Sequence, residues 1–194
     1  MGKNKIEPQT RDFFELKKEN IMTQKKGLPF MMASVVIWAC ILIVQITIDG
    51  YYEKNLATFC CSCLLMPLAI LGSKIVKANI FAKNGNPFDK LGFRLTMTQM
   101  LYILIPMWAF KEHPDKMVML YAIVFAAHLF PFSWLYDSGA YFIAGIVEAV
   151  MALILCLRFG VVVMAAFMLV AQIIVVIVLF TEIYHFKSAV RSDL

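Results

Sequence analysis

Residues 159–181 read FGVVVMAAFMLVAQIIVVIVLFT, a run of 23 residues that contains no charged side chain. The hydrocarbon core of a bilayer is about 30 Å thick, and about 20 apolar residues cross it as an α-helix. The run is therefore long enough to span a membrane once. Its apolar residues do not alternate with polar ones at every second position, as the strands of a membrane β-barrel would. The run predicts a transmembrane helix.

Five other stretches of the chain are similarly poor in charge. We therefore predict six transmembrane helices, at residues 28–48, 56–73, 94–110, 117–136, 139–157 and 160–183. The third is the weakest, because its charge-free run from Leu95 to Phe110 has only 16 residues. The fifth contains one acid, Glu148. The expected fold class is an all-α, polytopic transmembrane helical bundle that forms one domain.

The composition excludes the main soluble classes. Apolar residues make up 61% of the chain and charged residues 16%, against about 45–50% and about 25% in soluble domains. A soluble domain of this size lacks the interior to bury so much apolar surface. A soluble enzyme, a disulfide-stapled secreted domain and a disordered chain are excluded. The net charge of +5 is explained by the membrane, so no nucleic-acid partner is expected.

The Lys and Arg residues predict the orientation. With six spans both termini lie on one side, together with the basic loop 74–93. That side, counted with Arg94, carries 14 of the 18 Lys and Arg residues. An excess of basic residues marks the cytoplasmic side, so both termini are expected in the cytoplasm and the protein in the cell membrane, the inner membrane of a bacterium. Residues 1–27 are then a cytoplasmic segment, either a solvated tail or a short interfacial helix, and residues 185–194 are a cytoplasmic tail.

The basic loop has two interpretations. Its cations beside the membrane are suited to hold anionic lipid headgroups, or they only keep the loop inside, which is the simpler interpretation. The residues concerned are Lys74, Lys77, Lys83, Lys90 and Arg94.

Three polar side chains interrupt the later spans: His128, Glu148 and Gln172. Counted from the turns that join the helices, His128 and Glu148 both lie about 15 Å deep, and Gln172 lies within about 3 Å of that layer. Small residues, Ala144 and Gly145 among them, share the stripe of Glu148 at three-and-four spacing. Because small residues let helices approach closely, Glu148 is expected to face the bundle.

This layer predicts a proton- or ligand-binding site. Ionisable residues inside a membrane are costly and often functional. Desolvation opposes the charge of Glu148, so the acid could be neutral, or ionised beside a protonated His128. Either state exchanges a proton, as proton-coupled carriers require. The alternative is a structural role, with a neutral Glu148 bonded to Gln172 or His128. One imidazole and one carboxylate are too few ligands for a metal site.

The cysteines suggest a third possibility. Cys60 and Cys63 form a C-x-x-C motif, which resembles the quinone-linked thiol oxidases of the DsbB and vitamin K epoxide reductase type. The resemblance implies a redox-active pair. Those families also carry a second cysteine pair in an outer loop, and the predicted outer loops 49–54 and 111–116 contain no cysteine. Within an apolar run, thiols more often pack as small hydrophobes.

A second resemblance covers most of the chain. The segments 26–30 (KGLPF), 86–88 (NPF) and 128–131 (HLFP) resemble small six-helix bacterial membrane proteins of unknown function. This resemblance implies the helical membrane fold and no activity.

Three functions follow as hypotheses. The first is a small-molecule or ion carrier, or a ligand-binding membrane protein, that uses Glu148, His128 and Gln172 and is coupled to protons. The second is a non-catalytic accessory or sensor protein that acts through a membrane partner or a second copy of the chain. The third is a thiol–quinone oxidoreductase using Cys60 and Cys63. Nucleotide-binding and hydrolase motifs are absent from the sequence, so a role other than an enzyme is favoured, and neither a catalytic residue nor a cofactor is assigned.

Overall fold

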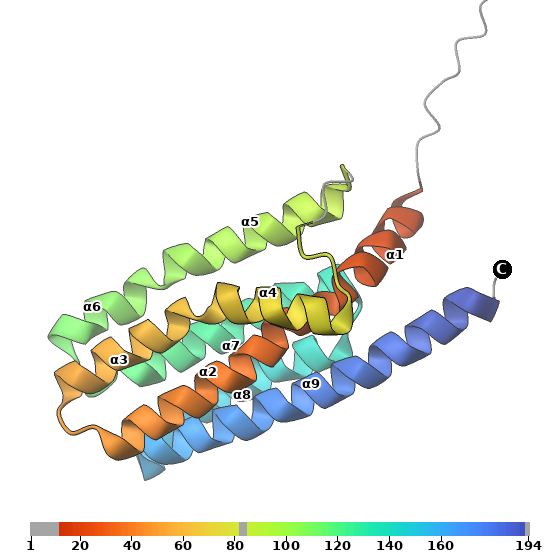
Figure 1. The fold of residues 1–194 in the computed structure, drawn as a ribbon. Coiled ribbons are helices and arrows are strands. Elements are labelled where there is room, and N and C mark those ends of the chain that lie inside the picture. The colour runs from red at the N-terminus through yellow and green to blue at the C-terminus, as the bar shows by residue number, and fades with distance from the viewer. Residues whose placement is uncertain (1–11, 82–84, 193–194) are drawn as a thin grey trace, which may run out of the picture.

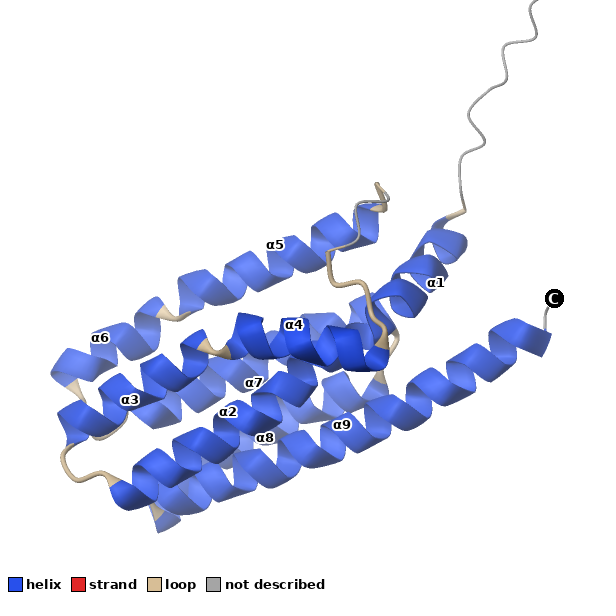
Figure 2. Ribbon diagram, viewed as in Figure 1, coloured by secondary structure: helices blue, strands red, loops and turns tan. Residues whose placement is uncertain are grey.

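A computed structural model describes residues 12–81 and 85–192 of the chain. Within these ranges the protein is built from helices joined by short loops, without β-strands (Figure 2). The helices are α1 (Phe13–Gln24), α2 (Leu28–Thr47), α3 (Tyr51–Cys63), α4 (Leu65–Val76), α5 (Pro87–Tyr102), α6 (Leu104–Glu112), α7 (Met117–Tyr136), α8 (Gly139–Phe159) and α9 (Val161–Ser192). A short 3₁₀ turn, η1 (Lys25–Gly27), joins α1 to α2.

The helices form six elongated rods that run up and down the bundle (Figure 1). The first rod is α1 followed by α2, the second is α3 with α4, the third is α5 with α6, and α7, α8 and α9 are rods by themselves. In Figure 1, α1 and the C-terminal end of α9 extend from the same end of the bundle. This is the arrangement that an even number of crossings requires.

Two of the rods are broken at the same position relative to a proline. The break between α3 and α4 lies at Leu64, three residues before Pro67, and the break between α5 and α6 lies at Ile103, three residues before Pro106. A proline has no backbone N–H to donate to the carbonyl four residues earlier, and its ring collides with that carbonyl. The prolines account for the missing backbone hydrogen bond at both breaks, whereas α7 continues through Pro131 without a break.

Five of the six predicted spans are confirmed as helical segments long and apolar enough to cross a membrane. These segments are Phe13–Thr47, Tyr51–Val76, Met117–Tyr136, Gly139–Phe159 and Val161–Ser188.

The predicted span at residues 94–110 is helical, and its crossing of the membrane stays a prediction. This region is two helices, α5 and α6, and it is not among the segments that are apolar enough to cross a membrane. Thr96, Thr98 and Gln99 lower its hydropathy, and the break at Ile103 divides it. The rod nevertheless packs along α7 (Figure 1).

Helix bounds also differ from those expected at the bundle end that holds the termini. Helix α5 begins at Pro87, inside the stretch assigned to the basic loop, and α9 continues to Ser192, through most of the stretch assigned to the tail. Asn86 explains the early start of α5, because its side-chain oxygen accepts a hydrogen bond from the backbone N–H of Phe88 at 2.9 Å, which caps the first turn. The cytoplasmic placement of this end stays a prediction.

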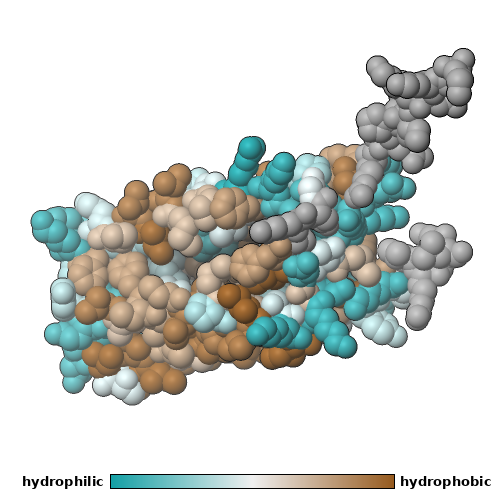
Figure 3. Space-filling view, turned by 45° about the horizontal axis from the view of Figure 1, so that its top comes forward, coloured by the Kyte–Doolittle hydropathy of each residue, from teal (hydrophilic) through white to brown (hydrophobic). Residues whose placement is uncertain are grey.

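The surface agrees with a membrane protein. Figure 3 shows apolar side chains between two hydrophilic ends of the face in view. Many large apolar side chains are exposed, including Ile75, which is 72% exposed, and Leu101, which is 67% exposed. An exposed apolar surface of this extent is unsuited to water and suited to lipid.

The interior is centred on α2 and on the pair α7 and α8. Trp38 and Ile41 of α2 are completely buried, as are Met168 of α9 and Ala122 of α7. Helices α7 and α8 approach closely at Gly145, where a β-carbon would lie 3.0 Å from the backbone nitrogen of Phe130. The glycine is therefore needed for this contact, and it lies on the stripe that carries Glu148.

Candidate functional site

Glu148 faces the interior of the bundle. The buried residues of α8 are Tyr141, Ala144, Gly145, Glu148 and Ala152, which form the three-and-four stripe expected from the sequence. The small side chains on either side of Glu148 let α8 lie close to its neighbours. As a result the acid is only 1% exposed.

Three helices contribute to one hydrogen-bonded cluster around this acid. The side-chain nitrogen of Gln172, on α9, donates to both carboxyl oxygens of Glu148, at 2.9 and 2.8 Å. The hydroxyl of Ser34, on α2, lies 2.7 Å from the side-chain oxygen of Gln172 and donates to it. Gln172 and Ser34 are 0% and 1% exposed. We call these three residues the central polar cluster.

The cluster lacks a compensating charge. Among the described residues, the ion pairs involve other acids, and none of them includes Glu148. Gln172 and Ser34 are neutral. An ionised carboxylate in this position would be desolvated with only dipoles around it, which is an expensive arrangement. A bound proton or a bound cation removes that cost.

His128 is not part of the central polar cluster. Its Nδ1 lies against the backbone oxygen of Phe125, one turn earlier on α7. The imidazole ring packs edge-on against the rings of Phe125 and Phe132, with centroid distances of 5.3 and 5.9 Å. The structure thus brings together Glu148 and Gln172 of the predicted layer and gives His128 partners within its own helix.

Ser34 is the member of the cluster that the sequence did not identify. The available signal was its polarity: in the apolar stretch from Leu28 to Ile46, Ser34 and Gln45 are the only hydroxyl- or amide-bearing side chains. Nothing in the sequence shows which helix pairs with α2. In the structure α2 packs along α9, and this contact brings Ser34 to Gln172.

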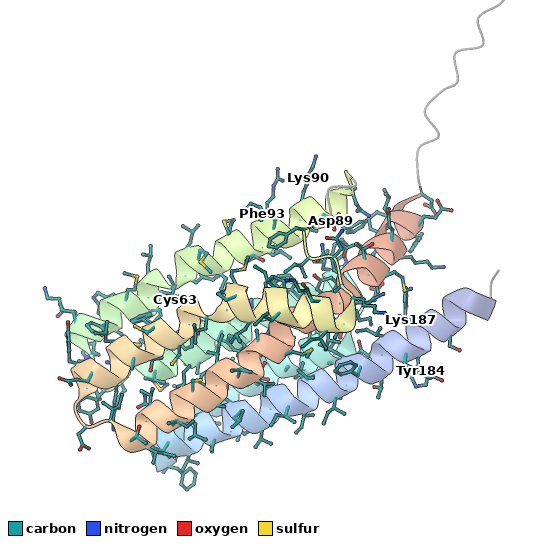
Figure 4. All side chains as sticks on the ribbon, viewed as in Figure 1. Cys63, Asp89, Lys90, Phe93, Tyr184 and Lys187 are labelled. Atoms are coloured by element: carbon teal, nitrogen blue, oxygen red, sulfur yellow. The ribbon has the colours of Figure 1, made fainter. Side chains whose placement is uncertain are left out.

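The cysteines are free thiols. Cys60 and Cys63 are exposed on α3, whereas Cys40 and Cys61 are partly buried. Figure 4 labels Cys63 on the rod formed by α3 and α4. Both residues of the C-x-x-C motif are exposed on the apolar segment Tyr51–Val76.

A second cluster of polar residues is buried at the end of the bundle that holds α1. This cluster was not predicted from the sequence. Lys26 is only 4% exposed. Its ammonium group donates to the backbone oxygen of Asp137 at 2.9 Å and to the carboxylate of Glu182 at 2.8 Å. The hydroxyl of Tyr141 donates to the backbone oxygen of Lys26 at 2.7 Å. We call Lys26, Asp137, Tyr141 and Glu182 the terminal polar cluster.

The backbone of η1 allows Lys26 to point inward. Lys25, Lys26 and Gly27 have φ values of 51°, 50° and 67°, a left-handed conformation that is uncommon for residues other than glycine. The turn redirects the chain between α1 and α2. A β-carbon at Gly27 would lie 3.1 Å from both the Tyr136 ring and the Tyr141 hydroxyl, so the chain passes close to α7 and α8 here.

Helix α1 is held across this end by further polar bonds. Asn20 and Gln24 donate to the same carboxylate oxygen of Asp89, at 2.7 and 2.6 Å. Gln24 also accepts from the hydroxyl of Tyr136 at 2.7 Å, and Lys17 forms an ion pair with Asp137. The short segment expected as a solvated tail or interfacial helix is, from Phe13 onward, a helix docked on the bundle.

Comparison with known proteins gives a family and no activity. Residues 13–182 match the model of a family described as "Family of unknown function (DUF7010)". No curated protein and no solved structure matches the chain. The match includes every residue of both polar clusters and confirms the resemblance to a family of unknown function.

Proposed function

The chain belongs to this family of unknown function, and we propose that it is a small membrane carrier that takes up a proton or a small cation at Glu148. The observation that supports the proposal is the carboxyl group of Glu148, which is 1% exposed and bonded only to the neutral amide of Gln172. We place the protein in the cell membrane, with the end that carries α1 in the cytoplasm.

The energetics favour a functional acid over a purely structural one. A charged side chain at the centre of a membrane helix costs roughly 2.5–3.5 kcal/mol on insertion scales. Hydrogen bonds between membrane helices average about 0.6 kcal/mol, so the bonds to Gln172 do not offset the cost of a charged Glu148. A proton or a cation at the carboxyl group offsets it directly.

The cluster can accommodate both protonation states. With Glu148 ionised, the Gln172 nitrogen donates to the carboxylate and the Gln172 oxygen accepts from Ser34, as observed. An amide can also turn over and exchange its oxygen and nitrogen. With Glu148 protonated, its hydroxyl would donate to the Gln172 oxygen and the Gln172 nitrogen would donate to Ser34. The single hydroxyl hydrogen of Ser34 would then bond the backbone oxygen of Met31, which is 2.7 Å away.

Loading of this site requires the bundle to open, because all three side chains are almost fully buried. Helices α2 and α9 each contribute one residue to the central polar cluster. At the end of the bundle, Lys26 links the start of α2 to Glu182 on α9. Separation of these two helices would expose Gln172 and Ser34 together, and the terminal polar cluster holds them closed.

The first test is the protonation state of Glu148. In infrared difference spectra of the protein in lipid vesicles, we expect a protonated-carboxyl band that is present in the wild type and lost in Glu148→Gln. Glu15→Gln, which removes an exposed acid of α1, is the matched control and should keep the band. A band that persists in Glu148→Gln contradicts the assignment.

The second test measures cation-coupled proton transport. Vesicles that enclose a pH-sensitive dye are given a gradient of Na⁺ or of choline as the test cation. We expect the gradient to move protons with the wild type and with Glu15→Gln, and not with Glu148→Gln. His128→Phe should behave as the wild type, because His128 is outside the cluster. A wild type that shows the infrared band and moves no protons would leave Glu148 with a structural role and contradict the carrier function.

A further inference from the structure

A hollow on the described surface lies near the start of α5, and none of its lining residues belongs to either polar cluster. It has a volume of about 380 Å³ and is lined by Asp89, Lys90, Phe93 and Arg94. The two cations are one helical turn apart, so their side chains reach the same side of α5. Lys90 and Arg94 are both exposed.

The hollow presents positive charge to a ligand. No ion pair is formed by Lys90 or Arg94 among the described residues. Asp89 is the one acid of the lining, and its carboxylate receives hydrogen bonds from Asn20 and Gln24 of α1. The Asp89 carboxylate is therefore engaged with α1, and Lys90 and Arg94 remain available to an anion.

An apolar stripe begins at the hollow and continues along the rod formed by α5 and α6. Its members are separated by three or four residues and are all exposed. The first three are neighbours on one face of α5, and the last two are neighbours on one face of α6, beyond the break at Ile103. They are Phe93 (64% exposed), Met97 (42%), Leu101 (67%), Leu104 (59%) and Trp108 (56%). Figure 4 shows Lys90 pointing away from the bundle, next to Phe93 on α5.

The surroundings of the hollow match a membrane interface. Phe13, Phe88 and Trp134 pack together near the start of α5, with ring centroids 5.2 to 6.3 Å apart. The ammonium group of Lys17 lies 4.8 Å from the centroid of the Trp134 ring. Tryptophan and lysine at the end of an apolar segment are typical of the level of the lipid headgroups.

We propose that this surface binds one anionic phospholipid, with its phosphate against Lys90 and Arg94 and an acyl chain along the stripe from Phe93 to Trp108. The two cations select the phosphate, as basic residues beside a membrane do, and the stripe selects a ligand with a long apolar chain. Of the residues expected from the sequence to meet anionic lipid, Lys74 and Lys77 do not line the hollow, and Lys83 lies outside the described residues.

The test measures lipid retention by native mass spectrometry after the protein is released from nanodiscs of mixed phosphatidylglycerol and phosphatidylcholine. The wild type should retain phosphatidylglycerol preferentially, and Lys90→Gln/Arg94→Gln should retain about tenfold less of it. The control Lys111→Gln/Lys116→Gln removes two cations at the opposite end of the bundle and should retain as much as the wild type. Equal loss in both double variants, or no loss in either, would overturn the proposal.

A second part of the experiment distinguishes a lipid ligand from a soluble anion. Leu101→Ser shortens the apolar stripe without changing any charge, and it should weaken retention of phosphatidylglycerol. Inorganic phosphate should not displace the lipid. If phosphate displaces it, or if Leu101→Ser has no effect, the surface is an anion site and the lipid assignment is wrong. Lys90, Arg94, Leu101 and Lys111 are exposed and Lys116 is partly exposed. Circular dichroism of each variant checks that it is folded.

Discussion

The two polar clusters differ in how their charges are compensated. In the terminal polar cluster, the buried Lys26 is paired with Glu182 and also bonds a backbone oxygen. In the central polar cluster, the buried Glu148 has only the amide of Gln172. A buried charge with an ion-pair partner is suited to hold a structure in one conformation. A buried acid without a charged partner is suited to gain and lose a proton, and this contrast is the basis of the proposed function.

The largest loss of stability is expected when the terminal polar cluster is broken. Lys26→Met leaves Glu182 without its ion-pair partner at the closed end of the bundle. Removing one partner of a buried pair typically destabilises a protein by about 3–5 kcal/mol, and the partly exposed Glu182 places this variant toward the low end of that range. Thermal unfolding in detergent measures the effect.

Lys18→Met provides the control for that experiment, because Lys18 is an exposed lysine on α1. It should unfold at nearly the wild-type temperature. If Lys26→Met unfolds at that temperature too, the terminal polar cluster does not hold the end of the bundle closed. The proposed structural role of that cluster would then be wrong.

An intermediate loss of stability is expected when the central polar cluster is displaced and all of its polar groups are kept. Gly145→Ala adds a β-carbon 3.0 Å from the Phe130 nitrogen, so α8 must move away from α7. Overpacking of this kind costs about 1–3 kcal/mol. The variant should unfold at a lower temperature and shift the infrared band of Glu148.

Gly139→Ala is the matched control for Gly145→Ala. A β-carbon at Gly139 would have no atom within 4 Å, so this variant should leave both the unfolding temperature and the infrared band unchanged. A band that stays in place in Gly145→Ala as well would show that the position of Glu148 does not depend on the close approach of α7 and α8.

The smallest loss of stability is expected for Ser34→Ala, which removes the hydrogen bond between Ser34 and Gln172 in the central polar cluster. The free energy of unfolding should fall by about 0.6 kcal/mol, the average for a hydrogen bond between membrane helices. The infrared band of protonated Glu148 should remain and shift in frequency, because in that state the Gln172 nitrogen loses the Ser34 hydroxyl as its acceptor. A loss of stability as large as that of Lys26→Met would show that Ser34 supports the helix packing itself.

Much of the fold was predictable because its causes are local. The apolar runs marked five segments that can cross a membrane. Pro67 and Pro106 lie just after the two breaks, but α7 runs unbroken through Pro131, so a proline alone does not predict a break. The stripe around Glu148 correctly indicated the inward face of α8. The third predicted span is helical but less apolar than the other five, because Thr96, Thr98 and Gln99 lower the hydropathy of the region without carrying charge. Its crossing of the membrane stays a prediction.

The candidate site was predictable only in part. Counting residues from the turns gives the depth of a side chain, and depth alone correctly grouped Glu148 with Gln172. Depth does not give the direction in which a side chain points around its helix. His128 shares the predicted depth and yet has its partners on α7. Lys26 was assigned to a cytoplasmic segment outside the bundle, either a solvated tail or a short interfacial helix. The left-handed turn at Lys25–Gly27 that buries it cannot be recognised from the spacing of apolar residues.

By itself the sequence determined that this protein is helical, with segments apolar enough to cross a membrane and an acid in the middle of its fifth rod, since length, hydropathy and spacing are properties of single segments. Only the tertiary structure decided which partners that acid has. The packing of α2, α8 and α9 brings Ser34 and Gln172 to Glu148 and leaves the imidazole of His128 and the ammonium group of Lys26 elsewhere. Contacts between helices depend on how each helix is rotated against its neighbours. The amino-acid sequence of one chain does not show that rotation.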